Sequence, residues 1–212
     1  DIKKEIEVVP NFIDVSVVKN NFTDCQRGLM ATEEERIITH ISNFRPVKRI
    51  MDVLDIFNTI QKEIPSKLLM VGEGPERLEA EKKAKDLGIK NKVIFFGNSN
   101  EIDKILCFSD LFLLPSERES FGLAALEAMI NRVPVISSNT GGIPEVNING
   151  VSGFLSEVGD VQQMAENAIT ILKEDETLIK FKNGAYNQAL NFDINKIVPK
   201  YIRLYESAMI NT

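Results

Sequence analysis

The sequence has few of the residues that form metal centres, disulfide frameworks or nucleophile–histidine pairs. Its only histidine is His40, and its two cysteines, Cys25 and Cys107, lie far apart without the spacing of metal ligands. Asp-x-Asp does not occur, so a carboxylate-held Mg²⁺ or Mn²⁺ has no obvious ligands. We therefore expect reduced thiols in a reducing compartment, a core or strand-end role for His40 rather than a catalytic one, and no metal ion.

Long apolar runs and an excess of basic residues are missing as well. No apolar run approaches the length of a membrane span, and the first residues show no signal-peptide pattern. The net charge of −6 argues against a nucleic-acid partner, because no excess of Lys and Arg offsets the charge of the phosphates. Together with the expected reduced thiols, these features predict a cytoplasmic protein.

What the sequence does contain is a regular alternation of two patterns. The composition, with 43% hydrophobic and 26% charged residues, is that of an ordinary globular protein. Apolar, β-branched runs occur at 37–41, 68–71, 93–96, 111–114 and 133–136. Helical patterns occur at 47–63, 75–87, 100–108, 121–131, 160–173, 175–190 and 195–209. This alternation predicts an α/β fold, a doubly wound parallel sheet covered by helices on both faces.

The first residues do not share this alternation. Residues 6–14 form a short β-rich run that a Pro-Asn turn ends, and residues 15–35 are polar and irregular. The acidic cluster at 33–35 is interpreted as a solvated face. The chain begins with Asp1 rather than methionine, which is typical of a piece cut from a longer protein and equally of a processed or tag-trimmed start.

The most informative stretch follows the apolar run at 111–114. Pro115-Ser116 ends that run, a charged turn follows, and Ser120 stands where a helix N-cap is expected. Backbone N–H groups at such a helix start can face an anion. Glu119 precedes the predicted helix, and Glu127 lies about two turns into it, roughly 10 Å along the axis. A nucleotide-sized ligand could lie along this face.

Ligands of doubly wound sheets bind beyond the carboxyl ends of the strands, so we expect the functional residues in the loops at those ends. The loop at 42–49 contains Arg45, Lys48 and Arg49. Cations at a helix start oppose the helix dipole unless an anion offsets them. Solvated cations are the alternative, but we interpret this loop as a phosphate-binding loop.

Three further strand-end loops are rich in glycine. The loop at 72–76 contains Gly-x-Gly, which on its own is more often a tight turn than a phosphate cradle. The loop at 97–100 offers backbone donors and acceptors for the edge of a base. The loop at 137–145 has adjacent glycines, which fit a tight connection and a ligand-facing backbone equally well.

Ordered motifs along the chain resemble a known family. They are Glu119-x7-Glu127 after Pro115-Ser116, Pro134-Val135-Ile136, Gly141-Gly142-x-Pro144-Glu145 and Gly150-x-x-Gly153-Phe154-Leu155. This set resembles retaining glycosyltransferases of family 4, whose GT-B architecture places two Rossmann-like domains on either side of a cleft. The resemblance covers nearly the whole chain. It implies the C-terminal, donor-binding half of such an enzyme, with most of the N-terminal acceptor domain absent.

Closer similarity points to one group within this family. The segments Ser42-Asn43-Phe44-Arg45-Pro46-Val47-Lys48-Arg49, Glu119-Ser120-Phe121-Gly122-Leu123 and Gly142-Ile143-Pro144-Glu145-Val146 carry it. They are similar to members that transfer N-acetylglucosamine from UDP-GlcNAc to L-malate, with retention of configuration, in bacillithiol biosynthesis. The resemblance therefore implies a UDP-GlcNAc donor, a small acceptor, no divalent metal and no other cofactor. It is compatible with a homodimer of the full-length form.

The resemblance also implies a role for individual residues. Glu119 would contact hydroxyls of the donor sugar, Glu127 those of the ribose, and Lys48 the diphosphate. Where the family commonly has Gly-Arg, this chain has Ser42-Asn43, so Arg45 or Arg49 would replace the usual arginine. Further donor contacts are implied for the backbone amides of Ser120, Phe121, Gly122 and Leu123, for Asn43 and Gly72, and for Gly97 beside the uracil.

The mechanism that the resemblance implies is stabilisation of the leaving group. Charge grows on the UDP diphosphate as the glycosidic bond breaks, and Lys48, an arginine such as Arg45, and the helix start would stabilise it. The acceptor hydroxyl would attack from the same face, so Glu119 need not be a nucleophile. Two other functions stay open: transfer to a lipid or glycan acceptor, and a noncatalytic nucleotide-binding module.

Three regions are expected along the chain. Residues 1–35 would be the interdomain linker and the tail of the N-terminal domain, since Val9-Pro10-Asn11-x-x-Asp14 resembles the family's interdomain segment. Residues 36–190 would form the Rossmann-like domain that binds the nucleotide-sugar donor. Residues 191–212 would form a C-terminal helix.

Overall fold

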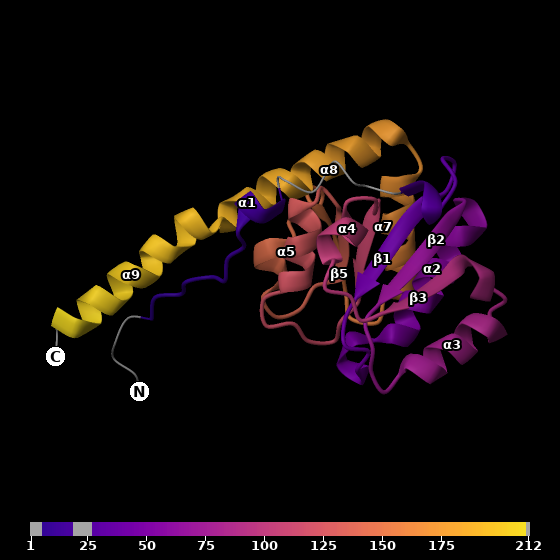
Figure 1. The fold of residues 1–212 in the computed structure, drawn as a ribbon, viewed down its shortest axis with the longest axis horizontal. Coiled ribbons are helices and arrows are strands. Elements are labelled where there is room, and N and C mark those ends of the chain that lie inside the picture. Colours follow the sequence, from indigo (N-terminus) through magenta and orange to yellow (C-terminus); the bar gives the residue numbers. More distant parts are fainter. Residues whose placement is uncertain (1–5, 19–26, 211–212) are drawn as a thin grey trace.

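The apolar runs of the sequence form a parallel sheet in the computed structural model, which describes residues 6–18 and 27–210. The strands are β1 (Arg36–Ile41), β2 (Ser66–Val71), β3 (Val93–Gly97), β4 (Leu111–Leu114), β5 (Val135–Ser138) and β6 (Gly153–Ser156). Their order across the sheet is β3-β2-β1-β4-β5-β6, and every neighbouring pair is parallel (Figure 1). The predicted doubly wound α/β class is therefore confirmed.

Helices cover both faces of this sheet. They are α1 (Val15–Val18), α2 (Ile50–Glu63), α3 (Arg77–Asp86), α4 (Ile102–Leu106), α5 (Leu123–Ile130), α6 (Ile143–Val146), α7 (Val161–Leu172), α8 (Asp175–Ala189) and α9 (Ile194–Ile210). Short 3₁₀ turns are η2 (Arg27–Leu29), η3 (Pro46–Lys48), η4 (Lys90–Lys92) and η5 (Leu190–Phe192). One apolar cluster joins the sheet to α2, α3 and α7, and another joins it to α5 and α6.

Successive strand residues explain why both faces need a cover. In β1, Ile38 packs into the cluster with α2 and α7, whereas its neighbour Ile37 packs with Leu69 and Ile105 on the opposite face. Ile37 and Ile38 are both fully buried. Strands buried on two faces read as continuous apolar runs, and this is why the sequence predicted four of them so closely.

The sheet places the functional loops at one edge. The chain moves outward through β1, β2 and β3, then returns to pair β4 with β1, with Ile38 opposite Leu111. The loops after β1 and β4 therefore leave the same edge in opposite directions. Such a switch point is where doubly wound sheets leave a crevice for ligands.

Several local predictions were wrong. Strand β6 was not predicted, and β5 begins at Val135 rather than at 133, because Pro134 offers no N–H to the ladder. The short helix α6 lies within a segment that was expected to be loop. Residues 6–12 form no strand, and Ile13 contributes only an isolated bridge to Asp193.

The N-terminal segment and α9 run side by side away from the sheet (Figure 1). The Ile13 N–H donates to the Phe192 carbonyl, and the Ile194 N–H donates to the Ile13 carbonyl, both at 2.9 Å. Phe12 meets the Tyr201 ring edge-on, with ring centroids 6.2 Å apart. The expected linker contains one helix, α1. Residues 1–5 and 19–26 of the expected linker lie outside the described residues, as do residues 211–212 of the expected C-terminal helix.

Two further findings concern the residues that the sequence lacks. Cys107 is disulfide-bonded, which corrects the expectation of a reduced thiol at that position, while Cys25 lies outside the described residues. Among the helices of the described residues, none combines the length and the apolar character needed to cross a bilayer.

Candidate functional site

A lysine–glutamate ion pair lies at the switch point. Lys48 ends η3 after β1, Glu119 lies in the loop after β4, and the Lys48 Nζ pairs with the Glu119 Oε1. The two side chains are only 22% and 13% exposed. The Ser116 Oγ donates a second hydrogen bond to the same carboxylate oxygen, at 3.0 Å. The fold thus brings together two residues, 71 positions apart in sequence, for which the resemblance implied catalytic roles.

Backbone hydrogen bonds join three strand-end loops around this pair. The Glu117 N–H donates to the Val47 carbonyl at 2.8 Å, which links the loops after β4 and β1. The Gly142 N–H donates to the Glu119 carbonyl at 3.0 Å, which adds the loop after β5. A Cβ at Gly141 would lie 1.8 Å from the Glu119 carbonyl oxygen. The adjacent glycines therefore allow close packing against the Glu119 backbone.

The start of α5 differs from the predicted one. The helix begins at Leu123, so Ser120 is not its N-cap, and Gly122 precedes the helix with φ 94° and no side-chain cap. A Cβ at Gly122 would lie 2.5 Å from the Ile143 Cδ1. The left-handed turn at glycine, rather than a serine cap, sets the start of this helix.

Free donors surround this helix start. Within the part of the chain that the structure describes, no acceptor receives the backbone N–H groups of Ser120, Phe121, Gly122 or Leu123. Phe121 is buried and packs edge-on against the Phe192 ring, with centroids 5.5 Å apart. This contact fixes the backbone that carries the free amides. Such a run of N–H groups beside a lysine can hold an anion.

Glu127 lies in α5 and interacts with Asp103 of α4. Because the helix starts at Leu123, Glu127 is about 6 Å along the axis from the start, not the predicted 10 Å. Burial, and next the negative charge of Asp103, raise the pKa of Glu127. The Asn131 Nδ2 donates to the Asp103 Oδ1 at 3.2 Å, which anchors the α4 side of this group.

Gly72, directly after β2, and Gly97, the last residue of β3, serve the packing of neighbouring loops. The Gly72 N–H donates to the Gly97 carbonyl at 2.7 Å, and a Cβ at Gly72 would lie 1.8 Å from the Ser42 carbonyl oxygen. Both glycines have positive φ, 123° and 71°. These close approaches bring the loop that starts at Ser42 against the loops after β2 and β3.

The two candidate arginines differ in their surroundings. The Arg49 Nε pairs with the Asp52 Oδ2 at 2.6 Å. Arg45 is exposed, as is Asn43 two residues before it, and no carboxylate among the described residues pairs with Arg45. Arg45 is therefore the arginine of this loop that is available to an incoming anion.

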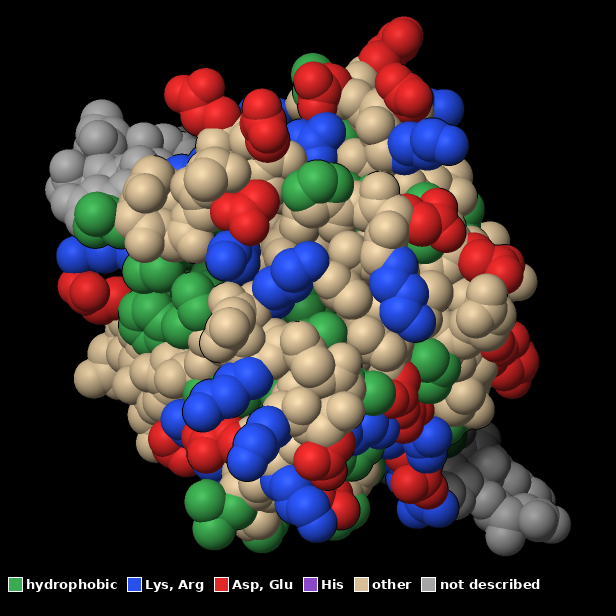
Figure 2. Space-filling model, turned by 90° about the vertical axis from the view of Figure 1, so that its right-hand side faces the viewer, with side chains coloured by type: hydrophobic (Ala, Val, Ile, Leu, Met, Phe, Trp, Pro, Cys, Tyr) green, Lys and Arg blue, Asp and Glu red, His purple; other side chains and the backbone are tan. Residues whose placement is uncertain are grey.

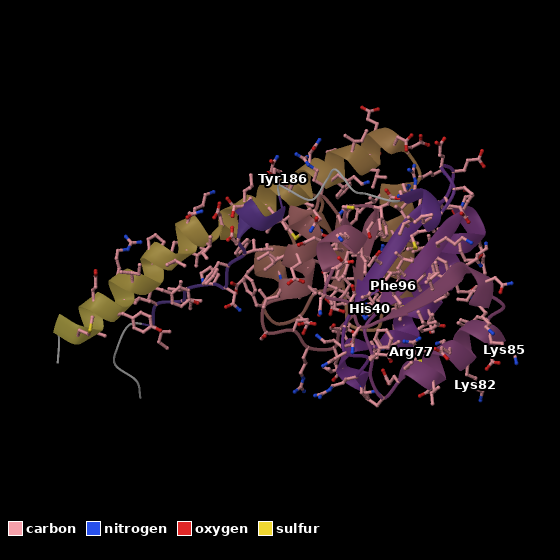
Figure 3. All side chains as sticks on the ribbon, in the orientation of Figure 1. His40, Arg77, Lys82, Lys85, Phe96 and Tyr186 are labelled. Carbon is pink, nitrogen blue, oxygen red and sulfur yellow. The ribbon has the colours of Figure 1, made fainter. Side chains whose placement is uncertain are left out.

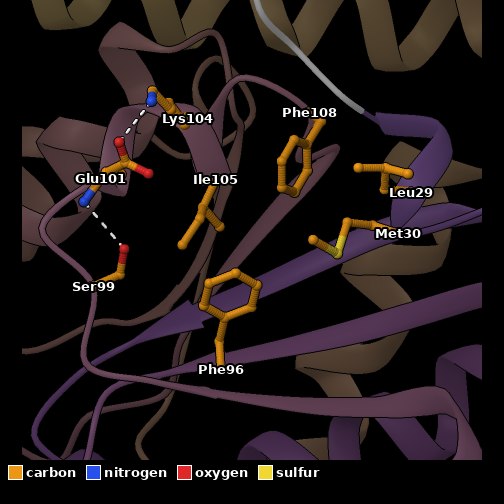
Figure 4. A pocket seen from close by; sticks show the side chains of 8 residues that line it. All are labelled: Leu29, Met30, Phe96, Ser99, Glu101, Lys104, Ile105 and Phe108. Carbon is orange, nitrogen blue, oxygen red and sulfur yellow. Dashed lines mark hydrogen bonds and ion pairs between the residues drawn. The ribbon is translucent and has the colours of Figure 1, made fainter.

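A hollow of about 240 Å³ lies beside the loop that follows β3 (Figure 4). Phe96, Ile105 and Phe108 contribute apolar walls, and Ser99 and Glu101 lie at its polar side (Figure 4). The Glu101 N–H donates to the Ser99 Oγ at 3.1 Å, which orders the end of this loop. Its lining does not include Lys48, Glu119 or Glu127, so it is a feature separate from the ion pair.

His40 is part of the core, as the sequence predicted. It is fully buried in β1, within the body of the fold (Figure 3). Burial lowers the pKa of His40 to about 4; the Leu113 carbonyl acts in the opposite direction, and the charge of Lys48 lowers the pKa further. His40 is therefore uncharged at neutral pH and has no direct access to a substrate.

Among the described residues no metal-binding group is found, and on one face of the molecule the charges are of mixed sign. Figure 2 shows Lys and Arg side chains interspersed with carboxylates on the face away from the tip of α9. Within residues 6–18 and 27–210, no group of three or more His, Cys, Asp or Glu side chains could hold a metal ion. Independence from metal stays a prediction.

A doubly wound sheet with a lysine and free amides at its switch point is the arrangement of nucleotide-binding α/β domains. Within that class, the family described as "Glycosyl transferases group 1" matches residues 24–188, and the chain belongs to this family.

Relatives in sequence support this assignment. The chain is 42% identical over 207 residues to the N-acetyl-alpha-D-glucosaminyl L-malate synthase of Bacillus anthracis, covering 95% of this chain and 54% of that protein. It is 30% identical over 159 residues to the 2-deoxystreptamine N-acetyl-D-glucosaminyltransferase of Niallia circulans, covering 71% of this chain and 41% of that protein. The chain thus spans about half the length of these curated relatives.

Solved structures share the fold. The Anabaena protein Alr3699/HepE, crystallised in complex with UDP and glucose, has a TM-score of 0.86 and 23% identity, over 95% of this chain and 57% of that one. Sucrose-phosphate synthase from Thermosynechococcus elongatus has a TM-score of 0.86 and 21% identity, over 97% and 53%. The expected GT-B type of Rossmann-like domain is confirmed as a fold.

Proposed function

We propose that this chain is the C-terminal, donor-binding half of a retaining glycosyltransferase that moves N-acetylglucosamine from UDP-GlcNAc to a small acceptor such as L-malate. The observation that carries the proposal is the Lys48–Glu119 pair beside the free amides of residues 120–123, at the switch point of the sheet. The 42% identity to an N-acetyl-alpha-D-glucosaminyl L-malate synthase supports the choice of sugar and acceptor.

The site divides into a phosphate side and a hydroxyl side. Lys48, Arg45 and the free amides before α5 supply positive charge and donors for a diphosphate, which are the groups that phosphates prefer. The carboxylates of Glu119 and Glu127 supply acceptors for hydroxyls of the sugar and the ribose. Partial burial of Lys48 and Glu119 makes their contacts stronger than they would be in bulk water.

In the proposed reaction, the bond between the sugar carbon and the diphosphate oxygen breaks, and the electron pair leaves with UDP. Lys48 and Arg45 stabilise the charge that develops on the phosphate. The acceptor oxygen bonds to the same carbon from the same face, and its proton passes to the departing phosphate oxygen. Glu119 is held by Lys48 and Ser116, so it positions the sugar and does not act as a nucleophile.

Substitution of Lys48 tests the donor site directly. Lys48→Ala should weaken UDP binding by about 1–3 kcal/mol, the size expected for a lost charge-assisted contact. Lys85→Ala is the matched control, because Lys85 is an exposed lysine on α3, remote from the ion pair (Figure 3). Calorimetry with UDP measures both variants. Absence of UDP binding by the unsubstituted chain at millimolar concentration would overturn the proposal and leave a noncatalytic module.

The acceptor domain is proposed to cover the exposed apolar side of the N-terminal segment and α9. Ile202 and Tyr205 on α9 are 50% and 68% exposed, and Val8 on the neighbouring segment is 74% exposed. Apolar surface of this kind typically meets a partner.

Assay of the full-length protein with UDP-GlcNAc and a panel of acceptors identifies the acceptor. Transfer to L-malate supports the proposal, and transfer only to a lipid or glycan contradicts it.

A further inference from the structure

A hydrogen-bonded chain runs beneath the proposed donor site through His40. The His40 Nδ1 lies 2.8 Å from the Leu113 carbonyl oxygen, and the His40 Nε2 lies 2.8 Å from the Ser42 Oγ. The Ser42 Oγ in turn lies 3.3 Å from the Phe44 backbone nitrogen. Leu113 belongs to β4 and Phe44 to the loop after β1, so the chain connects the two loops of the switch point.

The chemistry of the end groups fixes every proton in this chain. The Leu113 carbonyl can only accept, so the His40 Nδ1 carries the hydrogen. The His40 Nε2 is then an acceptor and receives the Ser42 hydroxyl hydrogen. The Phe44 N–H can only donate, and the Ser42 Oγ accepts it. Each donor therefore has an acceptor, and a single tautomer of a neutral imidazole satisfies the network.

The far end of the chain is a residue in a strained conformation. Phe44 has φ 39°, in the left-handed region that bulky side chains rarely occupy, and its side chain is fully buried. Its neighbours are Asn43 and Arg45, and Lys48 lies four residues beyond it. Such a backbone conformation persists only when surrounding contacts hold it, and the bond to Ser42 is one of those contacts.

The near end of the chain reaches the other half of the site. Leu113 is the second-last residue of β4, and Ser116, which donates to Glu119, follows shortly after it. Lys48 lies near enough that its charge acts on His40. A cationic side chain in place of His40 would therefore repel Lys48, whereas an uncharged group that donates at one atom and accepts at another suits the position.

We propose that His40 and Ser42 are positioning residues: they hold the loop that presents Arg45 and Lys48 in register with the loop that presents Glu119. The expected effect on donor affinity rests on the proposed function, whereas the hydrogen-bond network itself can be tested without a donor.

Ser42→Ala removes the middle hydroxyl while His40 stays in place. The matched control is Thr39→Val: Thr39 is a buried residue of the same strand, and its Oγ1 lies 2.7 Å from the Ser109 Oγ in a pair that does not include the loop. In the absence of UDP, amide hydrogen exchange at Phe44 should accelerate about threefold to tenfold in Ser42→Ala, the change expected for one lost hydrogen bond. Thr39→Val should leave that rate unchanged.

UDP calorimetry then tests the consequence. Ser42→Ala should weaken UDP binding by about threefold to tenfold, Thr39→Val should not, and Ser42→Thr, which keeps the hydroxyl, should restore most of the affinity. Equal Phe44 exchange rates in Ser42→Ala and Thr39→Val, or a ¹⁵N NMR signature of His40 protonated at Nε2, would overturn the inference. Failure of the unsubstituted chain to bind UDP, with Phe44 exchange as expected, would instead contradict the proposed function alone.

Discussion

His40 makes the stability of this protein depend on pH in a defined window. Its pKa is about 4 in the folded chain, against 6.5 for an ordinary histidine. Between these values the unfolded chain binds the additional proton, so the free energy of unfolding should fall as the pH drops from about 6.5 towards 4. The full effect of this one group is roughly 3 kcal/mol. Denaturant unfolding across this range measures it.

His40→Asn is the variant that isolates this contribution, because it removes the titrating group and keeps a polar side chain. Its unfolding free energy should depend on pH less steeply than that of the unsubstituted chain between pH 4 and 6.5. The raised pKa of Glu127 has the opposite effect on the free energy of unfolding, which it increases as the pH falls. Because both proteins contain Glu127, this effect cancels in the comparison. Parallel pH profiles would contradict the prediction.

At the scale of elements, two glycines flank α6 and serve different purposes: Gly141 lies in the turn before this helix, and Gly150 lies in the turn after it. Gly141 has φ 56°, and a Cβ there would lie 1.8 Å from the Glu119 carbonyl oxygen. Gly150 has φ 75°, but nothing lies within 4 Å of a Cβ at that position. The pair therefore separates conformational strain from a steric clash.

Gly150→Ala should lower the free energy of unfolding by about 1–2 kcal/mol, the cost of a left-handed conformation for alanine. Gly141→Ala should lose about 1–3 kcal/mol more, because the loop after β4 must move to make room. It should also weaken UDP binding, since Glu119 lies in that loop, whereas Gly150→Ala should not. Chemical denaturation and UDP calorimetry test both statements, and equal effects of the two substitutions would refute them.

The sequence predicts the elements of this fold unevenly, for physical reasons. Strand β4 is a continuous apolar run because both of its faces are buried, so composition alone reveals it. Strand β6 has four residues, begins with glycine and is only half-buried in the middle, so it has no comparable pattern. The start of α5 was placed at Ser120 because serine is a frequent N-cap, whereas the left-handed Gly122 sets it.

The residues of the candidate site were also predicted unevenly. Topology predicts that strand-end loops meet at one edge, and this placed Lys48 and Glu119 in a common site. The partners that hold them could not be predicted, because the bonds from Ser116 to Glu119 and from Ser42 to His40 depend on side-chain directions that a linear pattern does not encode. A serine at or near the end of a strand, Ser42 directly after β1 and Ser116 two residues after β4, is the sequence signal that these residues offered.

At the scale of the whole molecule, the chain corresponds to about half of its curated relatives. If donor binding resides in this half and acceptor binding in the other, the chain alone should bind UDP but should not transfer sugar to malate. Release of UDP from UDP-GlcNAc in the presence of malate measures transfer, with the full-length protein as the positive control. Measurable malate-dependent turnover by the chain alone would contradict this division.

The Lys48–Glu119 pair also bears on how the donor arrives. Because the lysine is already neutralised by a carboxylate, the edge of the sheet attracts a distant anion less than a free lysine would. A diphosphate that binds at Lys48 is then the second anionic partner of a lysine whose charge Glu119 already offsets. UDP affinity should therefore decline only weakly with ionic strength, and Glu119→Gln should make that decline steeper, a difference that calorimetry at low and high salt can measure.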